Sequence, residues 1–168
     1  MNYEIKNGVG VIRFDSPNSR VNSLSKEVMD DFHAVISELK DNSGVTSYVL
    51  ISGKPDCFIA GADIPMLERC KSVAEAEELV RGGHSILNSV EASPKPVVSA
   101  IMGSCLGGGL EVALVTHYRI AVKDKKTGLG LPEVMLGLLP GGGGTQRLPR
   151  LVIDGNFSIN YNLKCISD

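Results

Sequence analysis

The sequence predicts an α/β fold, and three observations support that prediction. Residues 46–52 form a continuous run rich in β-branched side chains, which is typical of a buried strand. Over residues 26–40, apolar side chains recur at helical spacing. Runs of both kinds alternate along the chain, and this alternation favours right-handed crossovers between strands.

The remaining elements follow in order along the chain. Further strands are predicted where short apolar runs lie between turns, at residues 8–14, 57–60, 95–101 and 118–122. Ser25 is expected to cap the first helix, which runs to about Lys40. Later helices are predicted at residues 74–90 and 110–117, with a short helical stretch at 132–136 inside a region punctuated by Gly and Pro.

Composition excludes several classes of function. A net charge of −2 provides no broad basic field, and 4 Tyr, 4 Phe and no Trp offer few faces for stacking bases, so nucleic acid is not expected as a partner. None of the 4 cysteines forms a C-x-x-C pair and no histidine has zinc-site spacing, so no metal is expected. The apolar stretch 97–115 contains glycines and the carboxylate of Glu111, which argues against a transmembrane segment.

The first of two glycine-rich segments reads GSCLGGGLE, from Gly103 to Glu111. A strand is expected to end here and a helix to begin, so the first N–H groups of the helix are unpaired and point outward. Such groups can hold a developing negative charge. The segment lacks the Lys of a P-loop and the spacing of a dinucleotide fingerprint. Close strand–helix packing, with Glu111 solvated in the first turn, explains these residues equally well.

The second segment contains Leu131-Pro132-Glu133, followed by four glycines that end at Gly144. Glu133 follows a proline at a predicted helix start and has apolar neighbours, so partial desolvation of its carboxyl group is expected. Desolvation favours the protonated form of a carboxyl group, which a general acid at neutral pH needs. Taken alone, Glu133 is more simply interpreted as a first-turn glutamate that interacts with the helix dipole.

A third segment, FIAGAD at residues 58–63, leaves a short strand through small side chains. Small side chains allow a backbone N–H to face a substrate oxygen. An ordinary turn, in which Asp63 caps the following helix, is at least as compatible with the same residues.

The segments CFIAGADI, GSCLGGGLEVA and LPEVMLGLLPGGGGTQRLPR together resemble the enoyl-CoA hydratase (crotonase) family. Three such motifs in the expected order are far more specific than any one of them, and the resemblance extends from about residue 8 to residue 152. Within the family, SPNSRVNSLSKE and RIAVKDKKTGLGLPEV are most similar to the hydratase domain of the mitochondrial trifunctional enzyme α subunit. The resemblance implies a crotonase-like core of repeated ββα units that form a spiral.

The resemblance also implies the site residues. Glu111 and Glu133 match the two catalytic glutamates of the family, and Ala62 and Gly108 match the two backbone N–H donors of its oxyanion hole. The positions that match its substrate-binding residues are Ala62, Asp63, Ile64, Pro65 and Gly108.

Some positions depart from the family pattern. Pro65 stands where many relatives have Lys, and Gly142 stands where many have Ala. The three histidines, His33, His84 and His117, match no catalytic position and are interpreted as structural or surface residues.

The implied activity is that of a 2-enoyl-CoA hydratase, a lyase that adds water to trans-2-enoyl-CoA in fatty-acid β-oxidation. Glu111 is favoured as the base toward water and Glu133 as the group that protonates C2. Coenzyme A is part of the substrate, and no cofactor is implied. The alternatives are a Δ3-Δ2 enoyl-CoA isomerase and a truncated, non-catalytic acyl-CoA-binding product.

The last residues, IDGNFSINYNLKCISD, depart from the family pattern. The sequence therefore predicts a crotonase domain over residues 1–152 and a divergent tail over 153–168, with the C-terminal helical part and its trimerisation elements missing. Apolar surface at residues 134–139 is then expected to stay exposed. The resemblance further implies mitochondrial localisation, with no transit peptide visible, and a thiolase-type β subunit as partner.

Overall fold

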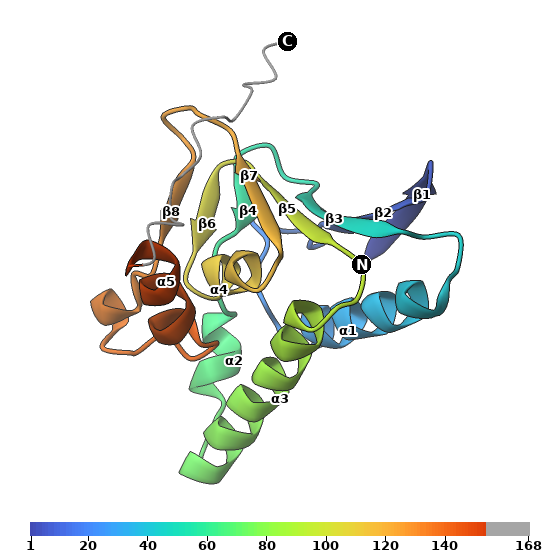
Figure 1. Cartoon of the computed structure of the whole chain (residues 1–168). Helices are drawn as coiled ribbons and strands as arrows, with labels where there is room; N and C mark the ends of the chain where they lie inside the picture. Colours follow the sequence, from blue (N-terminus) through green and yellow to red (C-terminus); the bar gives the residue numbers. More distant parts are fainter. Residues whose placement is uncertain (154–168) are drawn as a thin grey trace.

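A computed structural model describes residues 1–153, which form two β-sheets with helices packed against them (Figure 1). The larger sheet contains, in spatial order, β1 (Asn2–Lys6), β2 (Val9–Phe14), β3 (Ser47–Ser52), β5 (Val97–Ile101) and β7 (Tyr118–Ala121). The smaller sheet contains β4 (Cys57–Ile59), β6 (Ser104–Leu106) and β8 (Gly128–Gly130). Every pairing is parallel except that of β1 with β2, so the predicted α/β class is confirmed.

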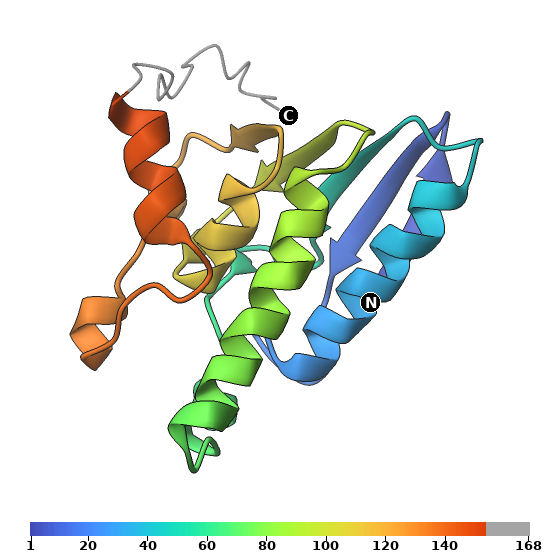
Figure 2. The ribbon, with the colours of Figure 1, turned by 60° about the horizontal axis from the view of Figure 1, so that its bottom comes forward.

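Two long helices, α1 (Lys26–Asp41) and α3 (Val73–Glu91), lie side by side over one face of the larger sheet (Figure 2). Ser25 caps α1 as predicted, since its hydroxyl oxygen accepts the N–H of Val28 at 3.3 Å. The buried face of α1 consists of Phe32, Val35, Ile36 and Leu39. Burial of this apolar stripe against the sheet is the main stabilising contribution of the helix.

The chain repeats a strand–strand–helix unit, in which one strand joins each sheet. The units are β3–β4 with α2 and α3, β5–β6 with α4, and β7–β8 with the 3₁₀ helix η1 and α5. The bounds of the remaining helices are Ile64–Glu68 for α2, Gly108–Leu114 for α4, Glu133–Leu136 for η1 and Gly144–Ile153 for α5. In each unit, the chain leaves the smaller sheet and immediately begins a helix.

Helix α4 lies directly against the smaller sheet. A β-carbon on Gly109 would collide with the carbonyl of Ile59 in β4, so only glycine permits this approach of helix to strand. The residues that follow are buried from Leu110 to Leu114. The helix predicted at residues 110–117 is therefore confirmed, although it begins at Gly108, within the triple glycine, and ends at Leu114.

Several elements differ from the sequence prediction. Strand β1 was not expected, because all five of its residues are exposed and carry no alternating pattern. Strands β6 and β8 have three residues each and are defined by their partners rather than by their composition. Helix α5 begins with glycine and contains Pro149, two features that favour a loop.

The apolar stretch 97–115 forms β5, β6 and α4, and no helix within residues 1–153 is both long and apolar enough to cross a membrane. The expected exposure around residues 134–139 is confirmed, with Val134, Met135 and Leu139 exposed by 77%, 83% and 84%. The predicted tail, apart from residue 153, lies outside the described residues.

Candidate active site

The site residues predicted from the sequence converge at one edge of the smaller sheet. Strands β4, β6 and β8 are mutually parallel, with Cys57 opposite Ser104 and Ser104 opposite Gly128, so their carboxyl ends meet at the same edge. The segment after β4 contains Ala62, the segment after β6 contains Gly108 and Glu111, and the segment after β8 contains Glu133. The carboxyl ends of parallel strands are where ligands commonly bind in open α/β sheets.

The backbones of Ala62 and Gly108 lie close together at this edge. Ala62 forms an isolated parallel bridge with Leu24, whose N–H donates to Gly61 O at 2.8 Å. Asp63 N–H in turn donates to Leu24 O at 3.1 Å, so the N–H of Ala62 points away from Leu24. A β-carbon on Gly108 would lie 3.5 Å from the Ala62 nitrogen. Within residues 1–153, neither the Ala62 nor the Gly108 amide donates a hydrogen bond.

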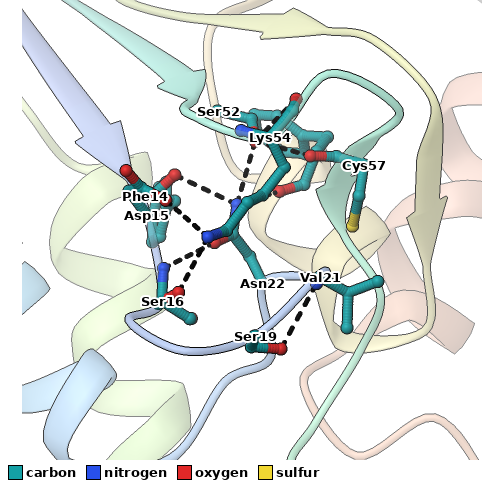
Figure 3. Close-up of polar contacts among 10 residues, drawn as sticks. Phe14, Asp15, Ser16, Ser19, Val21, Asn22, Ser52, Lys54 and Cys57 are labelled. Atoms are coloured by element: carbon teal, nitrogen blue, oxygen red, sulfur yellow. Dashed lines mark hydrogen bonds and ion pairs between the residues drawn. The ribbon is translucent and has the colours of Figure 1, made fainter.

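A buried amide side chain anchors the segment that contains Leu24. Asn22 is 1% exposed, and its Nδ2 atom lies 3.0 Å from Phe14 O, 2.9 Å from Phe58 O and 2.9 Å from Ser52 Oγ. Its Oδ1 atom accepts the N–H of Ser16 at 2.9 Å. As Figure 3 shows, the Asn22 side chain reaches the ends of β2 and β3 from a single loop. A buried amide with these partners is well satisfied.

The same anchor extends to β4. The carbonyl of Asn22 accepts the N–H of Ala60 at 2.8 Å, two residues before Ala62. Ser52 Oγ donates to Cys57 O at 2.5 Å, which ties the end of β3 to the start of β4. The position of the Ala62 amide therefore depends on the polar cluster around Asn22.

The carboxyl group of Glu111 is enclosed by the turn that precedes α5. Glu111 is 4% exposed, and its Oε1 atom accepts the N–H groups of Gly142 and Gly144, both at 2.8 Å. Two leucine side chains lie beside these glycines. A β-carbon on Gly142 would lie 3.1 Å from Leu87 Cδ1, and one on Gly144 would lie 2.9 Å from Leu131 Cδ1. Glu111 is thus held by two backbone donors in largely apolar surroundings.

Burial raises the pKa of Glu111 above the ordinary glutamate value, since it disfavours the charged form. The hydrogen bonds from Gly144 and Gly142 lower this pKa and partly offset burial. The negative charge of Glu133 raises it further, while His84 lowers it. His84 lies beside the same turn, since a β-carbon on Gly143 would lie 3.5 Å from its Cε1 atom, and its interpretation as a structural or surface residue stays a prediction.

Glu133 lies at the start of η1 and is half-buried. Its Oε1 atom lies 3.1 Å from where a β-carbon on Gly107 would be, so the carboxyl group lies against the turn that precedes α4. Its Oε2 atom is buried and has no hydrogen-bond partner within residues 1–153. A buried carboxyl oxygen of this kind can accept or donate a proton toward a bound molecule.

The residues that follow Ala62 form the first turn of α2. Asp63 is its N-cap, with Oδ1 accepting the N–H of Met66 at 2.8 Å, as the simpler interpretation of the sequence predicted. Ile64 is 47% exposed and Pro65 is exposed beside it. Both side chains are accessible to a molecule bound at this edge, and their role in binding substrate stays a prediction.

The arrangement combines two backbone donors with two carboxyl groups. The donors can stabilise an oxyanion, and the carboxyl groups can orient water and transfer protons. In the described part of the chain, no cluster of three or more His, Cys, Asp or Glu side chains is suited to hold a metal ion. The two carboxyl groups offer acid–base chemistry beside two unpaired backbone donors.

Two solved structures share this fold. An enoyl-CoA hydratase from Bacillus anthracis has a TM-score of 0.82 and 30% identity, over 90% of this chain and 57% of that chain. An enoyl-CoA hydratase from Thermoplasma volcanium has a TM-score of 0.83 and 30% identity, over 92% of this chain and 60% of that chain. The crotonase-like fold expected from the three motifs is confirmed by these structures.

Curated relatives are similar over most of this chain. The fatty acid oxidation complex subunit alpha of Shewanella oneidensis is 51% identical over 147 residues, which are 88% of this chain and 21% of that protein. Its counterpart in Shewanella baltica is 51% identical over 145 residues, 86% of this chain and 20% of that protein. The chain thus spans about a fifth of the length of these relatives.

These relatives correct one expectation. The resemblance to the mitochondrial trifunctional enzyme led to a prediction of mitochondrial localisation, and that prediction is wrong, because the relatives are bacterial proteins. Motifs that two related lineages share cannot by themselves distinguish one lineage from the other. The narrower likeness to the trifunctional enzyme is likewise not supported, whereas the link to fatty acid oxidation is.

A model of the enoyl-CoA hydratase/isomerase family matches residues 4–155, which is nearly the whole of the described chain. The match includes the three ordered motifs, the paired sheets and both glutamates. The similarity in sequence, in fold and in the order of the motifs leads to one conclusion: the chain belongs to the enoyl-CoA hydratase/isomerase family.

Proposed function

We propose that this chain is a 2-enoyl-CoA hydratase unit, which adds water to trans-2-enoyl-CoA in fatty-acid β-oxidation. The observation that supports the proposal most strongly is the convergence of two carboxyl groups, from Glu111 and Glu133, with the unpaired amides of Ala62 and Gly108. Hydration of an enoyl thioester needs all of these groups. Water must be activated, a carbon must be protonated, and the charge that develops on the thioester oxygen must be stabilised.

In this proposal, the thioester carbonyl accepts hydrogen bonds from the amides of Ala62 and Gly108. Each such donor contributes on the order of 3 kcal/mol to stabilisation of an oxyanion in other enzymes. Because Ala62 is bridged to Leu24 and Gly108 begins α4, hydrogen-bonded backbone holds both amides, and they need little reorganisation as the charge develops. Asp63, Ile64 and Pro65 would then line the path of the acyl-CoA, and no cofactor beyond the coenzyme A of the substrate is required.

The two carboxyl groups share the proton transfers. Glu111 is held through Oε1 by Gly142 and Gly144, which leaves Oε2 to orient and deprotonate water. Glu133, with its buried unpaired oxygen, would protonate C2. The negative charge of Glu133 raises the pKa of Glu111, so the two carboxyl groups interact electrostatically.

The principal alternative is a Δ3-Δ2 enoyl-CoA isomerase, which shares the family and the oxyanion donors. The presence of both glutamates favours hydration, because isomerisation moves one proton along the acyl chain and can use a single carboxylate. A non-catalytic acyl-CoA-binding product is a further alternative. No contact in the described residues favours it, and the assay below separates it from the enzymes.

The curated relatives are named as α subunits of a fatty acid oxidation complex. We propose that this chain corresponds to the hydratase portion of such a subunit, with a domain over residues 1–152 followed by a distinct tail. A thiolase-type β subunit is the partner that this proposal implies.

The test uses residues 1–168 with crotonyl-CoA, following the loss of the ultraviolet absorbance of the enoyl thioester. Glu111→Gln and Glu133→Gln should each reduce the rate by at least ~100-fold, the usual scale for acid–base groups. Glu78→Gln, an exposed glutamate on α3, is the matched control and should retain the wild-type rate.

The outcomes separate the alternatives. Hydration within a few-fold of wild type in either site variant would contradict the roles assigned to the glutamates. Conversion of a 3-enoyl-CoA without hydration of a 2-enoyl-CoA would identify an isomerase. Binding of acyl-CoA in equilibrium dialysis without turnover of either substrate would identify a non-catalytic binder.

A further inference from the structure

Arg147 makes more polar contacts near the site than its position on the surface of α5 suggests. Its side chain is only 13% exposed, and Nη1 donates to Gly142 O at 2.9 Å. Nη2 donates to Asn88 Oδ1 at 2.9 Å and to Glu91 Oε2 at 2.8 Å, and Nε donates to Glu91 Oε2 at 3.2 Å. The planar guanidinium thus links α3 to the turn before α5.

The turn that Arg147 contacts is the one that holds Glu111. The N–H groups of Gly142 and Gly144 both donate to Glu111 Oε1, and the carbonyl bound by Arg147 lies between them in the chain. Gly143 adopts a φ of 92°, a left-handed conformation that bends the backbone so that both N–H groups point inward. The Gly142 carbonyl belongs to the peptide group that joins Gly142 to Gly143, so its rotation would change the dihedral angles on both sides and displace the N–H groups of Gly142 and Gly144.

We propose that Arg147 is a positioning residue, which fixes the Gly142–Gly144 turn and so holds the carboxyl group of Glu111 in its working orientation. The proposal deepens the function proposed above, because Glu111 is one of its two acid–base groups. Arg147 itself touches no reacting atom in this scheme. Its effect reaches Glu111 only through the backbone of the turn.

The contacts of Arg147 with α3 depend on the shape of the guanidinium group as well as on its charge. Asn88 and Glu91 lie on the same face of α3, three residues apart, and receive both edges of the guanidinium. A lysine has the same charge but cannot form this planar, forked set of hydrogen bonds. Charge and geometry can therefore be separated by substitution.

Loss of the anchor should change the ionisation of Glu111 in a defined direction. The amides of Gly142 and Gly144 lower its pKa, so a relaxed turn should raise it. The other charged groups that act on this carboxyl group are Glu133 from η1 and His84 from α3. Both are unchanged in Arg147 variants, and Arg147→Lys also keeps the positive charge, so a pKa shift in Arg147→Lys reports the turn itself.

The experiment compares Arg147→Lys and Arg147→Met with Arg150→Met, an exposed arginine on the same helix, in the chain of residues 1–168. The pKa of Glu111 is measured by ¹³C NMR of labelled glutamate carboxyl groups, with Glu111→Gln used for assignment. Both Arg147 variants should raise this pKa and Arg150→Met should leave it unchanged. Thermal melts establish that each variant is folded, and Glu91→Gln, which weakens the anchor without replacing a residue of the turn, should relax the turn less and so shift the pKa in the same direction by less.

Kinetics provide a second readout where hydration is measurable. The acid limb of the kcat/KM profile should move to higher pH, and kcat should fall roughly 10-fold to 100-fold with little change in KM, as expected for a misplaced catalytic group. An unchanged Glu111 pKa in folded Arg147→Lys would overturn the proposal, as would a shift in Arg147→Met alone, which would indicate an effect of charge. Because the NMR titration needs no turnover, a failure of the proposed function is distinguished from a failure of this inference.

Discussion

The two sides of the candidate site are held in place by different kinds of interaction. On the side of Ala62, the anchor is the neutral amide of Asn22, which is 1% exposed and bonded to strand ends. On the side of Glu111, the anchor is the charged guanidinium of Arg147, whose partner Glu91 has a side chain that is 52% exposed. One anchor is buried and uncharged, and the other is an ion pair at the surface.

The two kinds of anchor suit the different functions proposed for the Ala62 amide and the Glu111 carboxyl group. The Ala62 amide must present one fixed dipole whatever the pH, and a neutral buried network provides that. The Glu111 carboxyl group must exchange protons, and a charged anchor near the surface leaves its ionisation adjustable. The first anchor should therefore contribute mainly to folding stability, and the second mainly to the chemistry of the site.

The largest effect should come from breaking the neutral anchor. Asn22→Ala removes the side-chain partner of the Ser16 N–H and of the Phe58 carbonyl, whereas the Phe14 carbonyl keeps the N–H of Gly53, and each unsatisfied buried group costs about 1–3 kcal/mol. We expect a loss of roughly 3 kcal/mol or more in the free energy of unfolding. Urea denaturation at low and high salt measures it, and the loss should be the same at both.

Ser19→Ala is the matched control, since Ser19 lies in the same loop but its exposed hydroxyl accepts only the N–H of Val21, at 3.3 Å (Figure 3). That variant should stay within about 0.5 kcal/mol of wild type. If Asn22→Ala were equally mild, or if its effect decreased with salt, the contrast between a neutral and a charged anchor would not hold.

The two anchor residues, Asn22 and Arg147, show what the sequence could and could not predict. The motifs identified Ala62, Gly108, Glu111 and Glu133, and the structure brings these four residues to one edge because each lies in a segment that follows a strand of the smaller sheet. Their roles stay predictions. Their anchors are defined by contacts between distant residues, 36 positions apart for the bond from Asn22 to Phe58. Periodicity and local motifs contain no information on such pairs.

The fold was predictable to a similar extent. Helix α1 was located by its apolar spacing and its serine cap, both of which are local features. The short strands β6 and β8, with the sequences SCL and GLG, become strands only through pairing with a neighbour. Helix α5 was missed for the opposite reason, since its glycines and Pro149 oppose helix formation locally.

A smaller loss of stability is expected from alanine substitutions at two adjacent glycines, Gly142 and Gly143, which test the charged anchor. Gly143→Ala places a methyl group on a residue with φ of 92° and against Nη1 of Arg147, so it should cost at least about 1–2 kcal/mol. Gly142 has no left-handed φ, but its added methyl group would meet Oε2 and Cδ of Glu111 at 2.5 and 2.9 Å, so it would displace the carboxyl group without straining the backbone. Gly142→Ala should therefore cost less stability than Gly143→Ala, helped by the lower entropy of its unfolded chain.

Thermal or urea denaturation of the two alanine variants, measured side by side, makes this comparison. Equal losses of stability would contradict the expectation. They would mean that the contact with Arg147 and the left-handed φ of Gly143 restrict the turn no more than the contact of Gly142 with Glu111 does. A large loss in Gly142→Ala alone would place the restriction at the carboxyl group instead.

The smallest effect should be a change in how stability depends on pH. Burial raises the pKa of Glu111 in the folded protein. Hydrogen bonds from the amides of Gly144 and Gly142 lower this pKa, so the net rise is smaller than burial alone would cause. A raised folded pKa means that the folded state binds the proton more tightly than the unfolded state. The stability of wild type is therefore reduced as pH rises from the ordinary glutamate value, about 4.3, through the folded pKa.

Glu111→Gln removes this titration and keeps an oxygen that can accept both glycine N–H groups. The melting temperature of the variant should therefore rise relative to that of wild type as pH increases from about 4 toward neutrality, and the difference should then level off. Glu78→Gln, exposed on α3, should show no such trend. A variant that instead lost relative stability with rising pH would mean that the two amides outweigh burial, so that the turn held by Arg147 stabilises the charged carboxylate more than its apolar surroundings disfavour it.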